Sequence, residues 1–161
     1  WLSLLESSYI VHLLRPYHRN FSKQLVKTPK LYFHDTGLAC SLLGIQSADM
    51  VRTHYLGGAL FENLVITEAM KSALNQGREP SMWFWRDHVG HEIDLLIEQG
   101  GRLEAIEIKS GMTYHPDVFK GIAYWMSISG AEQHDCRVIY GGEESLTTRQ
   151  GRVVSWKEMS F

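Results

Sequence analysis

The chain has 161 residues, of which 44% are hydrophobic and 21% are charged, proportions that predict one soluble globular domain with room for a small appendage. The formal net charge of −2 does not favour the strongly basic surface of many nucleic-acid-binding proteins, although a local basic patch is compatible with it. No run approaches the roughly 18 apolar residues of a membrane span, and no signal peptide is recognisable. Cys40 and Cys136 lack metal-type spacing and predict free thiols in a reducing cytoplasm.

The first 35 residues predict a small unit of their own. The chain starts at Trp1 rather than Met, in the middle of a helical pattern, so we expect it to be a piece of a longer protein. The elements expected in chain order are the end of a helix over 1–8, a strand over 9–14, a turn-rich basic loop over 15–20 and a second short strand over 31–33.

Basic side chains gather in this N-terminal unit. They could form a wing that contacts DNA phosphates, or they could simply be a solvated connector. The simpler interpretation is the connector. The residues concerned are Arg15, His18, Arg19, Lys23, Lys27 and Lys30.

Two helices are expected next, with a connector over 45–56 between them. Asp35 is the expected N-cap of a short helix over 38–43, which ends before a glycine. The second helix, over 57–75, has the clearest helical periodicity of apolar residues in the chain, and a glycine follows its end. Taken alone, Glu62 within it would be a surface glutamate.

An aromatic strand is expected over 81–85. Trp83 and Trp85 share one face of it, and core packing is a simpler role for them than stacking on exposed bases. His88 and His91 follow, but no cysteine or further histidine completes a set of ligands. Zinc is therefore not favoured.

Residues 91–111 predict a β-hairpin, because a Gly-Gly dipeptide at its centre suits a two-residue turn. With the turn centred there, Asp94 lies opposite Glu107 and Glu92 lies opposite Lys109. Since side chains alternate along a strand, these four groups are expected on one face. The other, core-facing set is expected to be Ile93, Leu95, Ile106 and Ile108.

The hairpin has two interpretations. In the first it is a strand pair with a solvated acidic face, on which Glu92 and Lys109 form a weak cross-strand ion pair. In the second, Asp94 and Glu107 supply hard oxygen ligands to a divalent cation, Mg²⁺ or Mn²⁺, with Lys109 as a nearby positive charge. The spacing alone does not decide between them.

The last third of the chain predicts an amphipathic helix over 116–129, a buried strand over 137–140 and a final edge strand over 153–156. Lys120 on the helix could approach a phosphate, although a solvated lysine is the simpler interpretation. The Gly-Gly dipeptides at 57–58 and 141–142 lack the lysine and the spacing of a P-loop. No ATP site is therefore expected in this fragment.

Four motifs, in order, resemble the uncharacterised C-terminal domain of AAA-type ATPases predicted in bacteria and archaea. Glu92-Ile-Asp94 followed by Glu107-Ile-Lys109 is also similar to the signature of the PD-(D/E)XK, restriction-endonuclease-like superfamily, which includes members without catalysis. The four motifs are Lys30-Leu-Tyr-Phe-His-Asp-Thr-Gly37, Gly58-Ala-Leu-Phe-Glu-Asn63, Phe84-Trp-Arg-Asp87 and Glu107-Ile-Lys-Ser-Gly111.

The resemblance implies an α/β fold in two parts. Residues 36–161 would form a restriction-endonuclease-like core of order αβββαβ, with a mixed central sheet flanked by helices. Residues 1–35 would be the end of a winged-helix module. Any ATPase activity would lie in a missing N-terminal part, which would be the partner of this domain.

The resemblance also implies a site and a reaction. Asp94 and Glu107 would hold Mg²⁺ or Mn²⁺, and Glu62 would complete the metal shell from the helix. Lys109 would act beside them as a catalytic residue, and Glu92, which departs from a bare three-residue set, could support Lys109. The expected function is metal-dependent hydrolysis of phosphodiester bonds in DNA or RNA. The alternative is a catalytically inactive module that binds nucleic acid or protein.

Overall fold

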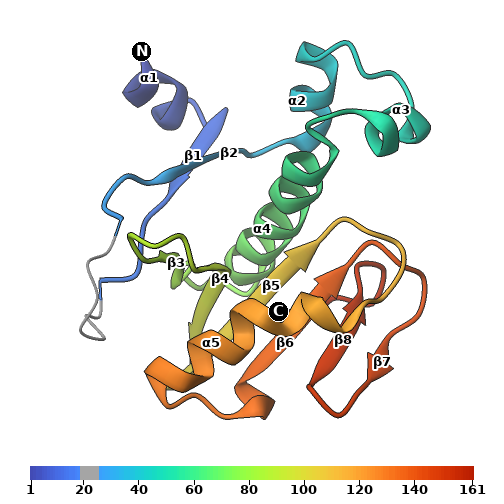
Figure 1. Cartoon of the computed structure of the whole chain (residues 1–161). Coiled ribbons are helices and arrows are strands. Elements are labelled where there is room, and N and C mark those ends of the chain that lie inside the picture. The colour runs from blue at the N-terminus through green and yellow to red at the C-terminus, as the bar shows by residue number, and fades with distance from the viewer. Residues whose placement is uncertain (19–25) are drawn as a thin grey trace.

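The centre of the protein is a six-stranded mixed sheet with helices on both faces, seen in a computed structural model that describes residues 1–18 and 26–161 (Figure 1). β3 pairs with β4 and β4 with β5 in antiparallel fashion, whereas β5–β6 and β6–β8 are parallel and β7 is antiparallel to β8. In sheet order the strands are β3 (Met82–Arg86), β4 (Glu92–Gln99), β5 (Arg102–Lys109), β6 (Cys136–Tyr140), β8 (Arg152–Ser155) and β7 (Leu146–Thr147).

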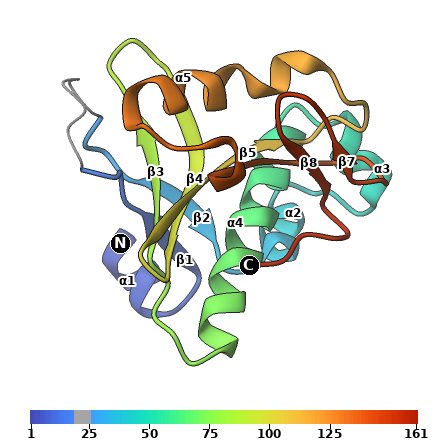
Figure 2. The same ribbon diagram turned by 90° about the horizontal axis from the view of Figure 1, so that it is seen from below.

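Two helices cover the sheet, one on each face. Figure 2 shows α4 (Gly57–Asn75) and α5 (Lys120–Ser129) on opposite sides of the strands. The α4-face cluster consists of Leu14, Tyr32, Val65, Ile66, Ala69, Phe84, Leu95, Ile106, Ile108 and Ile139. The α5-face cluster consists of Trp85, Ile93, Leu96, Ala105, Phe119, Ile122, Trp125, Cys136, Val138, Tyr140 and Val153.

Both long helices lie where their patterns predicted. α4 has the predicted bounds. The expected helix over 116–129 begins as a 3₁₀ turn, η1 (Pro116–Phe119), before α5 continues to Ser129. Gly130 then has a φ of +73°, the left-handed conformation that commonly ends a helix.

The N-terminal unit packs against α4. Its helix α1 (Leu2–Ser7) precedes a two-stranded antiparallel sheet of β1 (Val11–Leu14) and β2 (Lys30–Phe33). Asn63 of α4 accepts a hydrogen bond from the Phe33 N–H at 2.7 Å and donates one to the Phe33 carbonyl at 3.1 Å. Two of the expected basic residues, Arg19 and Lys23, lie outside the described residues.

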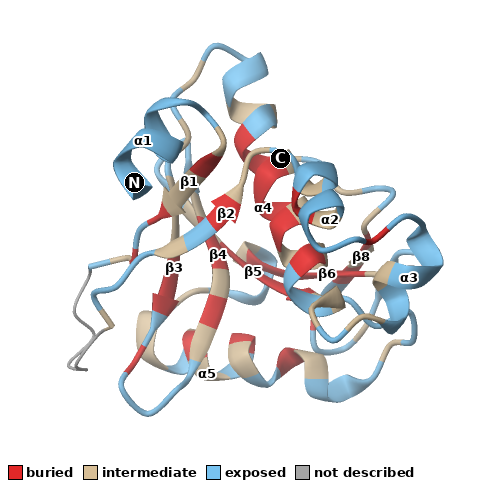
Figure 3. Ribbon diagram, turned by 90° about the horizontal axis from the view of Figure 1, so that it is seen from above, coloured by how far each residue is buried: buried red, intermediate tan, exposed pale blue. Residues whose placement is uncertain are grey.

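Between β2 and α4 the chain forms two short helices, α2 (Thr36–Leu42) and α3 (Ala48–Thr53). Asp35 caps α2 as predicted, accepting a hydrogen bond from the Leu38 N–H at 3.0 Å. The expectation of a plain connector over 45–56 is wrong, because Ser47 caps α3 and supplies a local start signal for that helix. Figure 3 shows that α1, α2 and α3 are largely exposed, whereas the inner side of α4 is buried.

The structure also bears on the edge strand, the cysteines and the expected lack of a membrane span. β8 is not the edge strand, because β7 pairs with its outer side. Cys40 and Cys136 are both free thiols. Among the described residues, none of the helices is long and apolar enough to cross a membrane.

The turn between β3 and β4 is organised by Asp87, whose side chain is fully buried. Its Oδ1 accepts hydrogen bonds from the backbone N–H groups of residues 89–91 at 2.9–3.0 Å, and its Oδ2 lies 3.0 Å from His91 Nδ1. Burial would raise the pKa of this carboxyl, but the hydrogen bonds from His91, Gly90 and Tyr124 lower it to about 2. The turn therefore depends on a carboxylate charge.

The central hairpin has the predicted turn and register, with pairs running from Leu95↔Ile106 to Gln99↔Arg102. On its other edge β4 contains a β-bulge, because Trp83 pairs with Leu96 and Trp85 pairs with Ile93. Two residues of β4 thus oppose one residue of β3.

The bulge changes which face each residue of β4 presents. Leu95 packs in the α4-face cluster as expected, but Ile93 packs in the α5-face cluster together with Leu96. The prediction that Ile93 shares a face with Leu95 is therefore wrong, since simple alternation fails across an inserted residue.

Candidate functional site

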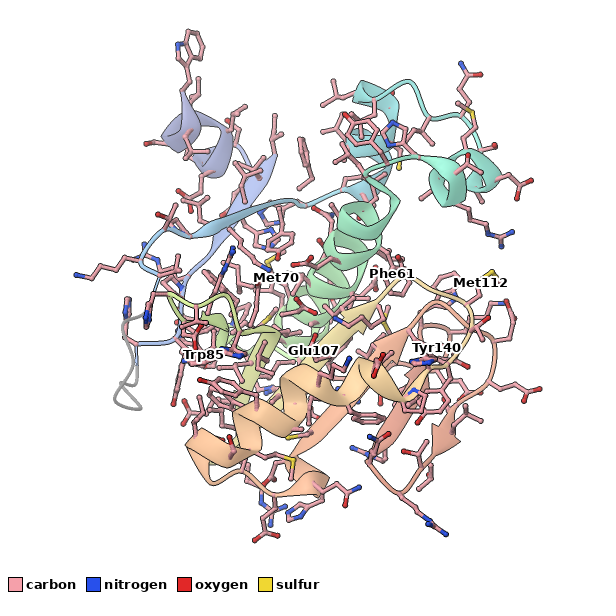
Figure 4. The ribbon with its side chains drawn as sticks, in the orientation of Figure 1. Phe61, Met70, Trp85, Glu107, Met112 and Tyr140 are labelled. Carbon is pink, nitrogen blue, oxygen red and sulfur yellow. The ribbon has the colours of Figure 1, made fainter. Side chains whose placement is uncertain are left out.

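The predicted site residues lie where β5 ends and β4 begins, next to the first turns of α4. A cleft of about 450 Å³ opens there, and Glu62, Asp94 and Lys109 line it. Glu107 lies near the centre of the molecule (Figure 4). A volume of this size is within the range of ligand sites in proteins.

Asp94 occupies the bulge of β4. Its Oδ2 accepts a hydrogen bond from the Ile108 N–H at 2.8 Å, just beyond the last regular pair of the hairpin, Leu95↔Ile106. This hydrogen bond from the backbone of β5 holds the Asp94 carboxylate between the two strands. Only 14% of the Asp94 side chain is exposed.

Glu107 reaches the site from the α5 face of the sheet. Its neighbours Ile106 and Ile108 point into the α4-face cluster, so Glu107 points towards α5. Gly121 makes room for it: a Cβ atom at that position would lie 1.8 Å from Glu107 Oε1. The Glu107 side chain is 6% exposed.

Burial and the adjacent Asp94 carboxylate together raise the pKa of Glu107 to about 8, and Lys109 offsets only part of this rise. Two carboxyl groups this close favour a proton or a cation between them. The pair therefore has the electrostatic character of a cation-binding site.

Lys109 faces both carboxylates. Its Nζ lies 2.8 Å from Glu107 Oε2 and 3.9 Å from Asp94 Oδ2. Burial would lower the pKa of Lys109, but Glu107 and Asp94 raise it above its usual range. Lys109 is consequently an ammonium ion at neutral pH.

A second cation enters the site from β2. Lys30 Nζ lies 2.8 Å from Glu62 Oε1 and 4.0 Å from Asp94 Oδ1, and it also pairs with Glu92. Tyr32 donates a hydrogen bond to the same Glu62 oxygen at 2.5 Å. Glu62 is thus held by the N-terminal unit.

The structure brings Asp94, Glu107 and Lys109 together, although Asp94 lies in the bulge, beyond the last regular pair Leu95↔Ile106, and not in a regular pair with Glu107. Glu62 lines the same cleft but is engaged by β2. The expected cross-strand pair of Glu92 with Lys109 is wrong: Glu92 pairs with Lys30 and lies 3.6 Å from Arg86. The reason is the bulge, because the regular pairing of β4 with β5 stops before Glu92 is reached.

Sequence reasoning missed Lys30 and Tyr32 as site residues. Lys30 was grouped with basic residues expected to form a solvated connector or, alternatively, a DNA-contacting wing, whereas the structure places it among the carboxylates. The i, i+2 spacing of Lys30 and Tyr32 indicates that both share one face of a strand. Their partner Glu62, however, is 32 residues from Lys30, and no local pattern connects positions so far apart.

The residues present fit a divalent cation through two carboxylates. Mg²⁺ is usually bound by one or two carboxylates together with waters and substrate phosphates, and Asp94 with Glu107 supplies such a pair. Over the described residues, no three or more His, Cys, Asp or Glu side chains are grouped so as to hold a metal ion together. Glu62 as a third ligand stays a prediction, and in this arrangement its Oε1 accepts hydrogen bonds from Lys30 and Tyr32.

Comparison with known proteins gives matches to two family models. One, described as a domain of unknown function (DUF4143), matches residues 57–159, and another, DUF8612, also a domain of unknown function, matches residues 1–49. DUF4143 domains are found as the C-terminal region of ATPase-like proteins of the AAA type.

Two mycobacterial proteins are similar to the chain. They are the uncharacterized protein Mb2031c of Mycobacterium bovis and the uncharacterized protein Rv2008c of Mycobacterium tuberculosis, each 32% identical over 113 residues. The match covers 70% of this chain and 25% of each relative, so the chain spans about a quarter of their length. No solved structure matches significantly.

Proposed function

We propose a function on the premise that the chain belongs to the DUF4143 family, whose members form the C-terminal region of AAA-type ATPase-like proteins. The chain is a nuclease-like domain that hydrolyses phosphodiester bonds of DNA or RNA in the cytoplasm, with Mg²⁺ or Mn²⁺, and its parent protein is an ATPase. The observation that carries this proposal is the meeting of Asp94 and Glu107 beside Lys109 at the bulge of β4.

The order of elements supports a restriction-endonuclease-like core. α4, the antiparallel strands β3, β4 and β5, then α5 and β6 follow one another along the chain. This is the order αβββαβ, and the candidate site lies on the β4–β5 hairpin within it. The unit of α1, β1 and β2 before α2 agrees with the remnant of a winged-helix module.

Each site residue has a role in this reaction. Asp94 and Glu107 hold the cation, which when bound would lower the pKa of a water ligand and offset charge on the scissile phosphate. Lys109 acts as a fixed positive charge, because its ammonium group lies beside both carboxylates. Its ammonium group neutralises the charge that develops on the phosphate.

The test is cleavage of single-stranded, duplex and branched DNA and RNA in Mg²⁺ or Mn²⁺, with calorimetric titration of Mn²⁺ alongside. We expect Asp94→Asn and Glu107→Gln to abolish Mn²⁺ binding, and both variants and Lys109→Met to lower cleavage at least 100-fold. Glu98→Gln, at an exposed position of the same strand, is the matched control. Cleavage that survives in Asp94→Asn would refute the proposal.

A non-catalytic module for nucleic-acid or protein binding is the second candidate. It is favoured by one observation: Lys30 and Lys109 already neutralise much of the carboxylate cluster. This candidate predicts that nucleic acid or a partner protein binds equally well to the wild type and to Asp94→Asn, and that neither cleaves.

A further inference from the structure

We infer that Lys30 is an internal cation that competes with the divalent ion for the site, so that docking of the β1–β2 hairpin and metal binding oppose each other. This inference rests on the proposed metal site and names its regulation. Lys30 is a positioning residue here: it acts on Asp94, Glu62 and Glu92, not on the substrate.

The Lys30 ammonium group is surrounded by acidic side chains. It lies among three carboxylates, those of Glu62, Glu92 and Asp94, and its side chain is 24% exposed. A lysine side chain carries a positive charge at neutral pH, and this one is paired with Glu62 and Glu92. An ammonium ion therefore stands where acidic groups converge.

The two oxygens of Asp94 show why this charge matters for a metal. Oδ2 faces Lys109 and accepts the Ile108 N–H, whereas Oδ1 faces Lys30 at 4.0 Å. A divalent ion that approaches Oδ1 meets the positive charge of Lys30. At such distances two like charges in a partly buried site repel each other more strongly than they would in water.

Lys30 also engages the two other carboxylates that lie beside the metal pair. It holds Glu62 and Glu92, and Tyr32 from the same strand holds Glu62 as well. When Lys30 leaves, Glu62 and Glu92 lose their counter-ion, and the cluster becomes a stronger cation site. Withdrawal of one side chain would thus raise metal affinity in two ways.

The hairpin that carries Lys30 is distinct from the elements that carry the carboxylates. β2 lies within residues 1–49, which match one family model, and the carboxylates lie within residues 57–159, which match another. Any event that pulls the hairpin from α4 would therefore increase metal affinity. By linkage, metal binding loosens the hairpin by the same free energy.

The experiment compares Mn²⁺ titrations of the wild type and Lys30→Met. Lys71→Met is the matched control, because Lys71 also pairs with a glutamate of α4, Glu68, on the exposed surface. We expect Mn²⁺ to bind Lys30→Met at least 10-fold more tightly and the control as the wild type does. Equal or weaker binding to Lys30→Met overturns the inference.

The outcomes separate this inference from the proposed function. One outcome is that Mn²⁺ binds the wild type, that Glu107→Gln abolishes this binding, and that Lys30→Met binds no more tightly than the wild type. This outcome upholds the proposed site and rejects the role of Lys30. Binding only to Lys30→Met supports the inference. No binding to either protein rejects both.

Hydrogen exchange of the wild type provides a test that does not depend on the variant folding. Addition of Mn²⁺ should accelerate exchange of the β1 and β2 amides, whereas the amides of β5 and β6 should keep or gain protection. Hydrogen exchange of the β1 and β2 amides that does not change at saturating Mn²⁺ overturns the inference.

Discussion

Replacing Glu107 by glutamine should stabilise the protein at alkaline pH. The pKa of Glu107 is raised from 4.5 to about 8, so the folded state prefers this carboxyl in its neutral form. Glutamine has nearly the same shape as the protonated acid and carries no charge. It can still accept a hydrogen bond from Lys109 and donate one to Asp94.

The magnitude follows from the pKa. At about 1.36 kcal/mol for each pKa unit, the rise from 4.5 to about 8 corresponds to roughly 5 kcal/mol. The side chain is only 6% exposed, so solvent screens little of it. The pKa of Glu107 is higher in the folded state than in the unfolded state. The stability that this carboxyl contributes to the wild type is therefore fully present below about pH 4.5 and is lost as the pH rises through about 8.

The assay is urea unfolding at pH 5, 7 and 9 without divalent ions. We expect Glu107→Gln and the wild type to differ little at pH 5, and the variant to be several kcal/mol more stable at pH 9. Glu98→Gln, on the exposed part of β4, controls for the general effect of removing one charge. A Glu107→Gln protein that is less stable than the wild type at pH 9 would refute the electrostatic description of the site.

Two further predictions concern residues that position the site. Asp87→Asn should be about 2 kcal/mol less stable than the wild type at pH 7. The difference in stability between the two proteins should shrink as the pH falls from about 4 towards 2. The reason is that the ionised Asp87 stabilises the folded state, and this carboxylate becomes protonated over that pH range. Urea unfolding at pH 7 and pH 3 measures this, and a constant difference would contradict the role of the charge in capping 89–91. Gly121→Ala should displace the Glu107 carboxylate, since the new Cβ would lie 1.8 Å from its Oε1. We expect Mn²⁺ affinity to fall at least 10-fold, measured by calorimetry, whereas Gly58→Ala, which has room for its Cβ, should bind as the wild type does.

The sequence predicts best the elements whose signals are local. α4 has its predicted bounds because a long apolar periodicity is followed by a glycine, and the hairpin has its predicted register because two glycines fix the turn. Gly100 and Gly101 both have positive φ angles, as such a turn requires. The hairpin register alone suffices to predict that Asp94 lies near Glu107.

The parts that could not be predicted are those set by the rest of the molecule. Residues 93–95 contain no glycine or proline to mark a bulge, so the changed face of Ile93 and the lost Glu92–Lys109 pair follow only from packing against β3. The approach of Lys30 to Glu62 is likewise non-local. The short strand β7 has two residues, too few for any periodicity to reveal.

The bulge in β4 has a consequence for how distant relatives are aligned. Residues alternate between the α4 face and the α5 face of the sheet, and this alternation is shifted by one position after the bulge. A relative that lacks the extra residue therefore places equivalent residues on the same face only when one position is skipped in the alignment. An ungapped comparison through this strand would therefore match residues of the α4 face with residues of the α5 face on one side of Asp94. A single-residue gap placed at the bulge restores the correspondence, and relatives that need no such gap are the ones expected to keep an acidic side chain there.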